Sequence, residues 1–229
     1  MAIVSGRQGQ AVGMMPWNLA FVTDQVSDLN MFYRGGGTVF PVLQNHEDGS
    51  TTSNLEPTAR KKLVGKIGEI DDLQILDYVY GVLHSPTYRE KFKAFLRSDF
   101  ARIPVPTDRV EFDRVADFGG KLRGLHLLTD PDLVDYATLF PEYGTGEVDR
   151  HQLDGTKVWI NDKQYFEGVP ESVWDFYIGG YQPAQKWLKD RKGQTLSSDD
   201  IDRYQQILEA IRRTDELMKD FEDVPPSWA

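Results

Sequence analysis

Hydrophobic and polar positions change their spacing along the chain and divide it into three portions. Over residues 1–69, short apolar runs at 19–22 and 38–43 alternate with glycines and polar turns, a pattern typical of β-strands. Over residues 70–142, apolar side chains recur at three- and four-residue steps, which indicates amphipathic helices. Residues 143–229 begin strand-like and continue as helices. The sequence therefore predicts an α+β fold, in which the three portions are separate units or parts of one compact domain.

Capping residues mark the helices of the middle portion. One face of the first helix carries Ile70, Leu73, Leu76, Tyr80 and Leu83. Ser85 and Pro86 then provide the N-cap and first turn of a second helix. Thr107 is the expected cap of a third helix, in which Gly119-Gly120 lets another element pack closely.

Two polar segments predict turns between strands. Asn161-Asp162 lies between strand-like stretches at 157–160 and 163–166 and suits a two-residue hairpin turn. Residues 46–54 are polar and contain Asp48-Gly49, so we expect a loop or the tip of a long hairpin there.

The last portion ends in helices. Pro170 and Pro183 stand at first-turn positions of two short helices, over residues 171–177 and 183–192. Ser197 and Asp200 have the spacing of a capping box, which opens a long amphipathic helix over residues 199–222.

Composition limits the classes of protein to which the chain can belong. Its 229 residues are 40% hydrophobic and 12% aromatic, enough for a sizeable core. The absence of cysteine excludes disulfides, thiolate catalysis and cysteine-bound metal, and it fits a reducing compartment. No apolar stretch approaches the length of a membrane span, and the first ten residues lack a signal-peptide pattern. We expect a soluble cytoplasmic protein that has no membrane partner.

The acidic charge is concentrated in one part of the chain. The net charge is -10, which by itself argues against binding to nucleic acid. Residues 1–54 carry 2 basic and 4 acidic side chains, residues 55–125 carry 13 and 11, and residues 126–229 carry 11 and 21. The sequence therefore permits DNA contacts within residues 1–125 and directs the DNA away from the last hundred residues.

Familiar catalytic and metal-binding motifs are absent. Gly6, Gly9 and Gly13 lack the spacing of a dinucleotide or phosphate loop, and neither GxSxG nor HExxH occurs. His46-Glu47-Asp48 is interpreted as a solvated loop tip rather than a metal site. We expect no catalytic or metal-ligating residue in this chain. A hydrolase assembled from dispersed carboxylates stays open as an alternative, which a deep pocket with paired buried carboxylates would support.

Polar side chains among the first strands and glycine turns have the chemistry to read bases. In the DNA major groove Arg pairs with guanine, Asn or Gln with adenine, and Asp with cytosine. The candidate base-reading residues are Arg7, Gln8, Gln10, Asn18, Asp28, Asn30 and Arg34.

Several short segments, in this order, resemble a known family. They are DYVYGVLHSPTYR at 77–89, FARIP at 100–104, GLHLL at 124–128, GGYQ at 179–182 and WLKDR at 187–191. The closing helix adds Thr214 and Leu217-Met218. Together they resemble the carboxy-terminal specificity region of single-chain type ISP restriction-modification enzymes, and the resemblance covers nearly the whole chain.

The resemblance implies a target recognition domain without catalysis of its own. Enzymes of that family carry a nuclease, a helicase-like ATPase and an adenine-N6 methyltransferase that uses S-adenosylmethionine. This region selects the target: a β-rich part enters the major groove and a helical part packs on the methyltransferase. The expected partners are double-stranded DNA and the methyltransferase module. S-adenosylmethionine, ATP and Mg are expected only in the modules absent here, so the chain is either an excised fragment or a separate specificity subunit.

The resemblance also ranks the candidate residues. Among the base readers it favours Arg7, Gln8, Gln10 and Arg34. The expected phosphate-binding residues are Arg60, Lys61, Lys62 and Lys66. The segment 77–89 is interpreted as helix packing and caps. The alternative function is an acidic protein–protein interaction module that makes no contact with DNA.

Overall fold

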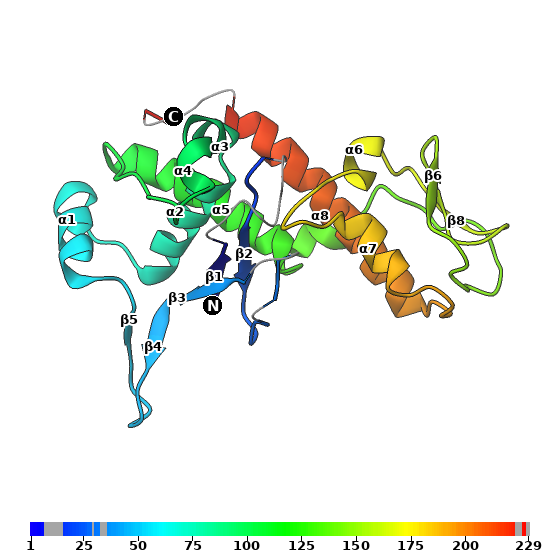
Figure 1. Ribbon diagram of the computed structural model, residues 1–229, viewed down its shortest axis with the longest axis horizontal. Helices are drawn as coiled ribbons and strands as arrows, with labels where there is room; N and C mark the ends of the chain where they lie inside the picture. Colours follow the sequence, from blue (N-terminus) through cyan, green and yellow to red (C-terminus); the bar gives the residue numbers. More distant parts are fainter. Residues whose placement is uncertain (7–15, 29, 33–35, 223–225, 228–229) are drawn as a thin grey trace.

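The computed structural model describes residues 1–6, 16–28, 30–32, 36–222 and 226–227. Antiparallel sheets occupy two parts of the chain and helices occupy most of the rest, so the fold is α+β, as the sequence predicts. Figure 1 shows the first sheet, the long last helix and the third sheet spread along the longest axis of the molecule.

A three-stranded antiparallel sheet contains the first strands. Its order is β2-β1-β3, where β1 is Ala2–Ser5, β2 is Ala20–Thr23 and β3 is Thr38–Pro41. Ile3 of the buried central strand pairs with Val22 on one side and with Phe40 on the other. Strand β3 is exposed at all four positions. Strand β2 at one edge alternates buried and half-buried positions, and among the described residues no further strand pairs with β3 at the other edge.

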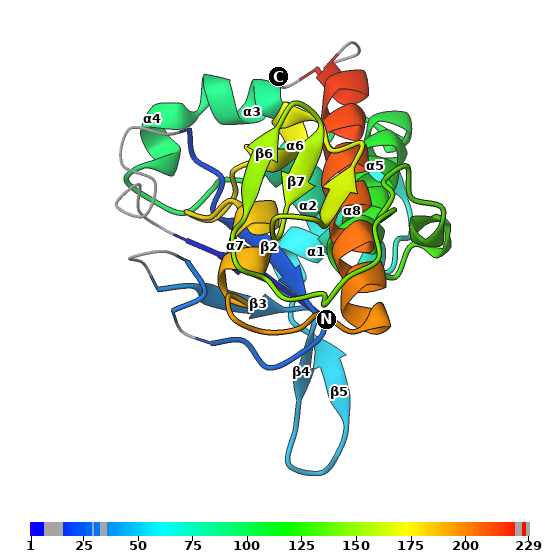
Figure 2. The same cartoon turned by 90° about the vertical axis from the view of Figure 1, so that its right-hand side faces the viewer.

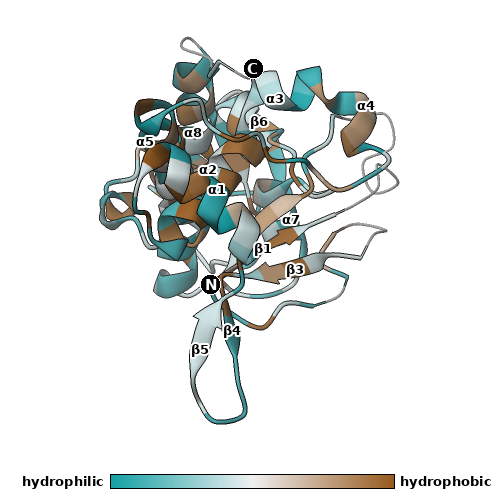
Figure 3. Ribbon diagram, turned by 90° about the vertical axis from the view of Figure 1, so that its left-hand side faces the viewer, coloured by the Kyte–Doolittle hydropathy of each residue, from teal (hydrophilic) through white to brown (hydrophobic). Residues whose placement is uncertain are grey.

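A second pair of strands forms a ribbon that extends away from the body. Strand β4, Leu43–Asn45, pairs antiparallel with β5, Thr51–Ser53. The polar segment at 46–54 thus forms the tip and second strand of a hairpin, as the sequence predicts. Figures 1 and 3 show this ribbon projecting from the helices, coloured largely as hydrophilic in Figure 3.

Helices α2 (Asp72–His84) and α5 (Arg109–His126), which carry Gly81 and Gly119, pack closely against each other next to the first sheet. A methyl group on Gly119 would lie 1.8 Å from the Asp77 carbonyl oxygen, and one on Gly81 would lie 2.4 Å from the Val115 carbonyl oxygen. The close approach predicted for the glycine pair in this helix is confirmed, and both helices need glycine for it. The other helices of this part are α1 (Pro57–Ile67), α3 (Pro86–Lys91) and α4 (Lys93–Leu96).

The sequence predicts two caps among these helices, and the one at α3 is confirmed whereas the one at α5 is wrong. The Ser85 hydroxyl accepts from Tyr88 N at the start of α3. Thr107 does not cap α5, because the cap is Asp108, whose carboxylate accepts from Glu111 N at 2.9 Å. The Thr107 side chain instead donates to the Glu111 carboxylate.

The third sheet, a 3-10 helix and three further α-helices make up the rest of the chain. The sheet has the order β6-β7-β8, with β6 Gln152–Asp154, β7 Lys157–Trp159 and β8 Tyr165–Glu167. The turn predicted at Asn161-Asp162 is wrong in length: Trp159 pairs with Tyr165, and the Asn161 amide oxygen accepts from two backbone N–H groups inside this longer loop. The remaining elements are the 3-10 helix η2 (Pro131–Val134), α6 (Glu171–Trp174), α7 (Pro183–Lys189) and α8 (Ser198–Glu222).

Helix α8 connects two hydrophobic cores. The first core holds the first sheet together with α2 and α5, so strands and helices of residues 1–142 share it. The second lies between the third sheet and α6–α8. Phe221 of α8 stacks on Phe118 in the first core, whereas Tyr204 of α8 packs edge-on against Phe166 in the second. Figure 2 shows α8 passing beside the third sheet.

Within the described residues, none of the helices has both the length and the apolar character that crossing a membrane requires.

Candidate nucleic-acid interface

The β4–β5 ribbon is anchored at its foot and directed away from the body. Val42 N donates to Met1 O at 3.0 Å, so the chain leaves β3 still paired with the first sheet. Asn54 N closes the foot by donating to Val42 O at 2.9 Å. The Ser53 hydroxyl donates to the Asp72 carboxylate at 3.0 Å, which joins β5 to the start of α2. The ribbon is therefore a rigidly attached extension of an edge strand.

Hydrogen bonds also order the tip of the ribbon. His46 N donates to Ser50 O at 2.9 Å, and Gly49 has a φ of +80°, which favours glycine. The Asp48 carboxylate accepts from both the backbone N–H and the hydroxyl of Ser50, at 2.9 and 2.6 Å. Both hydrogen bonds lower the pKa of Asp48, the hydroxyl bond more strongly. The tip is a defined turn that presents acidic and imidazole side chains to solvent.

Helix α1 follows the ribbon directly and supplies the positive charge near it (Figure 1). The cap is Glu56, whose carboxylate accepts from Thr58 N and Ala59 N. Three of the four predicted phosphate-binding residues, Lys61, Lys62 and Lys66, are exposed, and none has an ion pair with another described residue.

The fourth predicted phosphate-binding residue has another role. Arg60 forms an ion pair with Asp72 and donates from Nη2 to Ile70 O at 2.9 Å. Its side chain is about one-third exposed and holds α1 against the start of α2. Because its charge already has a partner, we remove Arg60 from the phosphate-binding set and assign it to positioning α1.

The predicted base-reading residues fall into three groups. Arg7, Gln8, Gln10 and Arg34 lie outside the described residues. Asp28 and Asn30 are exposed in the segment between β2 and β3, where the Asp28 carboxylate accepts from Asn30 N at 2.6 Å. Their side chains remain accessible to a ligand.

Asn18 differs because its side chain is buried and both of its polar atoms have hydrogen-bond partners within the protein. It is 7% exposed, donates from Nδ2 to Tyr177 O at 2.8 Å, and accepts from Gly179 N at 3.1 Å. The residue connects the first sheet to the loop before α7, across about 160 positions of sequence. We therefore correct its assignment from base reading to structural support.

Sequence reasoning missed the strand residues of the ribbon as candidates. Gln44, Asn45, Thr51 and Thr52 are all exposed on the ribbon, and only Thr51 and Thr52 lie in the polar stretch 46–54, which the sequence predicts to be a loop or a hairpin tip. The signal that could have found them is the Thr-Thr-Ser run after Asp48-Gly49, which is typical of a second hairpin strand.

A chain of hydrogen-bonded polar side chains lies between α2, α5 and α8, in which Tyr80 and Thr214 are buried and His126 is half-buried. The Thr214 hydroxyl donates to Ala210 O at 2.7 Å, so it must accept from His126 Nε2, 3.0 Å away. His126 Nδ1 is then the acceptor for the Tyr80 hydroxyl at 2.6 Å. Burial, reinforced by the charge of Arg89, lowers the pKa of His126 to about 4, so the imidazole is neutral at pH 7. The chain joins three helices and leaves no ring nitrogen of His126 free for catalysis.

The buried acidic side chains of the described residues face basic or N–H groups rather than one another. Arg123 donates twice to Asp77, at 2.6 and 3.0 Å, and Glu111 accepts from Ser227 N at 2.7 Å. Arg212 and Arg213 bind Glu209. No two of these carboxylates share a site within the described part of the chain, so the arrangement that would support a hydrolase is not found there.

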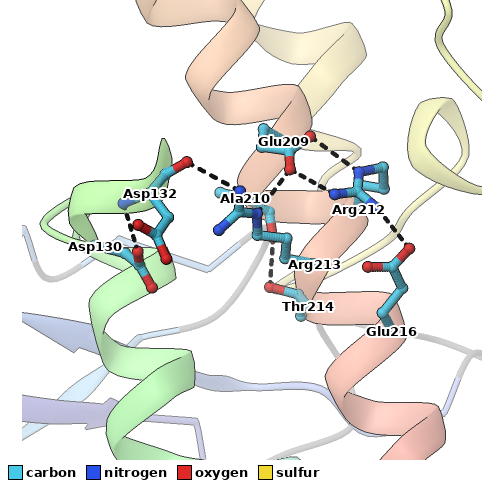
Figure 4. Close-up of polar contacts among 8 residues, drawn as sticks. All are labelled: Asp130, Asp132, Glu209, Ala210, Arg212, Arg213, Thr214 and Glu216. Atoms are coloured by element: carbon cyan, nitrogen blue, oxygen red, sulfur yellow. Dashed lines mark hydrogen bonds and ion pairs between the residues drawn. The ribbon is translucent and has the colours of Figure 1, made fainter. Parts of the chain in front are cut away.

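The Glu209 cluster fixes α8 to η2. Burial raises the pKa of Glu209, but hydrogen bonds from Arg212 and Arg213 outweigh it and hold the pKa at about 2. Arg213 also donates to Asp132 O at 2.9 Å, which bridges to η2 (Figure 4). The Glu209 side chain is 1% exposed, so this is a buried ion-pair cluster with a structural role.

Comparison with known sequences identifies one family. Residues 1–220 match the family described as the Type ISP C-terminal specificity domain. No curated protein matches the chain.

Solved structures with the same fold come from larger proteins. A cryo-EM structure of a DrdV–DNA complex matches with a TM-score of 0.75 and 20% identity, over 99% of this chain and 24% of that one. The structure of the ATP-dependent Type ISP restriction-modification enzyme LlaBIII bound to DNA matches with a TM-score of 0.71 and 17% identity, over 96% of this chain and 16% of that one. The structure of a nuclease-deletion mutant of the Type ISP restriction-modification enzyme LlaGI, in complex with a DNA substrate mimic, matches with a TM-score of 0.65 and 18% identity, over 96% of this chain and 20% of that one. The chain spans less than a quarter of the length of each.

Proposed function

The chain belongs to the family of Type ISP C-terminal specificity domains, and on that premise we propose that it selects the DNA target of a restriction-modification enzyme. The observation that carries the proposal is the exposed, polar β4–β5 ribbon followed at once by a helix with three exposed lysines. Phosphate contacts from lysines hold a protein in position on DNA, and side chains in a groove read the sequence. The ribbon and α1 provide both kinds of group side by side.

The distribution of charge supports the same orientation. Residues 126–229 carry 11 basic and 21 acidic side chains, and the third sheet within them lies at the opposite end of the molecule from the ribbon (Figure 1). We assign this acidic end to contacts with protein, namely the adenine-N6 methyltransferase module of the parent enzyme. That module uses S-adenosylmethionine, and this chain contributes recognition without catalysis.

The exposed apolar side chains before the third sheet favour such a protein contact. Val134, Leu139 and Tyr143 are 70%, 59% and 99% exposed; Val134 is the last residue of η2, and the other two lie between η2 and β6. Single exposed apolar residues are common, but three within ten positions suit the apolar core of an interface with another protein.

The test of DNA selection is a fluorescence anisotropy titration of the chain with a random duplex pool at several salt concentrations. The triple substitution K61A/K62A/K66A should weaken binding to all duplexes and reduce the slope of log affinity against log salt by roughly 2 to 3, since each phosphate contact contributes about 0.9. The matched control is K163A/K189A/K192A, which makes the same change in net charge at three exposed positions of the acidic end.

The control variant should bind DNA as the unchanged chain does. Equal losses in both triple variants would show that binding depends only on net charge, and an absence of DNA binding at low salt would contradict the proposal itself.

A further inference from the structure

The ribbon has the shape that a DNA major groove accepts. Five of its six strand residues are exposed and Ser53 is half-buried, so both faces project beyond the body. Two paired strands lie about 4.8 Å apart. The major groove of B-DNA is about 12 Å wide and admits a two-stranded ribbon. The β4–β5 ribbon can therefore enter a groove without a change in the rest of the fold.

The two faces of the ribbon differ in how their polar groups are used. Gln44 pairs across the ribbon with Thr52, and this face is internally bonded: Gln44 Nε2 donates to Asn54 Oδ1 at 2.5 Å, and His46 Nε2 lies 2.8 Å from Thr52 Oγ1. The opposite face carries the paired residues Asn45 and Thr51.

Among the described residues, neither the Asn45 amide nor the Thr51 hydroxyl has a hydrogen-bond partner, and both are exposed. Because they are directly paired across the strands, they form one unit on one face. The ribbon thus leaves one donor–acceptor pair open at a fixed position.

We propose that the Asn45–Thr51 face of the ribbon reads base edges in the DNA major groove, with the Asn45 amide paired to an adenine. This inference rests on the proposed function and names the residues that perform it. An asparagine amide donates to adenine N7 and accepts from the adenine N6 amino group at the same time. Thr51 reads the neighbouring base through its hydroxyl or its methyl group.

The charges of the ribbon indicate that it contacts bases, and that other residues bind the DNA phosphates. Residues 43–53 contain Glu47 and Asp48 and neither lysine nor arginine, so the ribbon does not attract phosphates. A carboxylate in the major groove is favourable only where it accepts from an amino group such as cytosine N4. Affinity must come from groups outside the ribbon, and the lysines of α1 follow it directly in the chain.

The experiment selects duplexes from a random pool with the unchanged chain and with three variants: N45A, Q44A and the K61A/K62A/K66A triple. The unchanged chain should enrich a defined sequence. N45A should enrich the same sequence except at one adenine, where preference falls about 5- to 150-fold, with the salt slope unchanged. Q44A, which removes an amide from the other face, should keep the full preference, and the lysine triple should lower affinity without altering the sequence.

A modified base identifies the contact. Replacing that adenine by 7-deazaadenine removes the N7 acceptor, so it should weaken binding by the unchanged chain and have no further effect on N45A. Melting temperatures confirm that each variant is folded.

If the unchanged chain selects a sequence and N45A selects it equally well, the assignment of Asn45 is overturned while target selection stands. Enrichment of no sequence by the unchanged chain at low salt overturns target selection, and the assignment of Asn45 with it.

Discussion

His126 donates a hydrogen bond to Thr214 across 88 positions of sequence, and this bond joins α5 to α8. The pKa of His126 is lowered from 6.5 to about 4 by burial, so unfolding raises it again. Below pH 6.5 His126 is protonated in the unfolded chain but stays neutral in the folded chain, so the free energy of unfolding falls until the pH reaches about 4.

We expect the chain to be about 2 kcal/mol less stable at pH 5 than at pH 7 from this group alone. Buried His84, whose pKa is also well below its usual range, acts in the same direction. Urea unfolding at a series of pH values measures the effect. H126N should make the profile less steep between pH 6.5 and 4, with the remaining slope due to His84, whereas H46Q, on the exposed ribbon, should retain the full slope. A profile that is the same in H126N and the unchanged chain would show that His126 titrates normally.

Glu209 affects the stability of the fold in a lower range of pH than His126. Its pKa of about 2 lies below the ordinary 4.5, so its contribution to stability is complete above pH 4.5 and is lost as the pH falls toward 2. Since Arg212 and Arg213 are partly exposed, we expect E209Q to cost about 2 kcal/mol at pH 7. E216Q removes one exposed ion pair on the same helix and should change stability by less than about 0.5 kcal/mol. Similar losses in both variants, measured by urea unfolding, would contradict the buried role of Glu209.

Gly119 and Gly65 should respond in opposite directions to the same substitution. A methyl group at Gly119 meets the α2 backbone, so G119A forces the helices apart and should destabilise the chain by about 3 kcal/mol or more. At Gly65, inside α1, nothing lies within 4 Å, and G65A should stabilise by about 0.5 to 1 kcal/mol. Thermal unfolding measures both, and a neutral G119A would show that α2 and α5 can separate easily.

Asn18 should affect folding but not sequence choice. N18A leaves Tyr177 O and Gly179 N without their partner, which costs about 2 kcal/mol or more. DNA selection with the folded fraction should enrich the same sequence as the unchanged chain. A lost preference at one base with no loss in melting temperature would restore Asn18 as a base contact.

The ribbon should be removable without loss of the fold. Leu43 and Ser53 pair directly, so an Asn-Gly turn can replace residues 44–52. The shortened chain should retain its melting temperature within a few degrees because the replaced strand residues are exposed. Its preference among duplexes should disappear, and a shortened chain that selects the original sequence would place recognition elsewhere.

The sequence predicted elements whose signals are local. The cap at Ser85, the capping box at Ser197 and Asp200, and the apolar periods of α2 and α8 all lie within a few residues of the structure they specify. The predicted cap of α5 is one residue away from the actual cap, because Thr107 and Asp108 are both residue types that cap helices well. Only the fold shows that the Thr107 hydroxyl donates to the Glu111 carboxylate while Asp108 caps the helix.

The candidate site was harder to predict because it depends on distant partners. Asn18 has the chemistry of a base reader, and its burial follows from a loop about 160 residues away. Arg60 and Lys61 are indistinguishable in charge, yet only Arg60 faces Asp72. Asn45 and Gln44 are adjacent amides, and their difference in availability comes from the pairing of two strands.

The exposure of the ribbon has a consequence for how target preference can change over time. Substitutions at Asn45 or Thr51 leave no cavity and break no contact with either core, so they should change the free energy of unfolding very little. Most interior positions lack this freedom. New specificities can therefore arise in the ribbon by single substitutions, without compensating changes elsewhere in the chain.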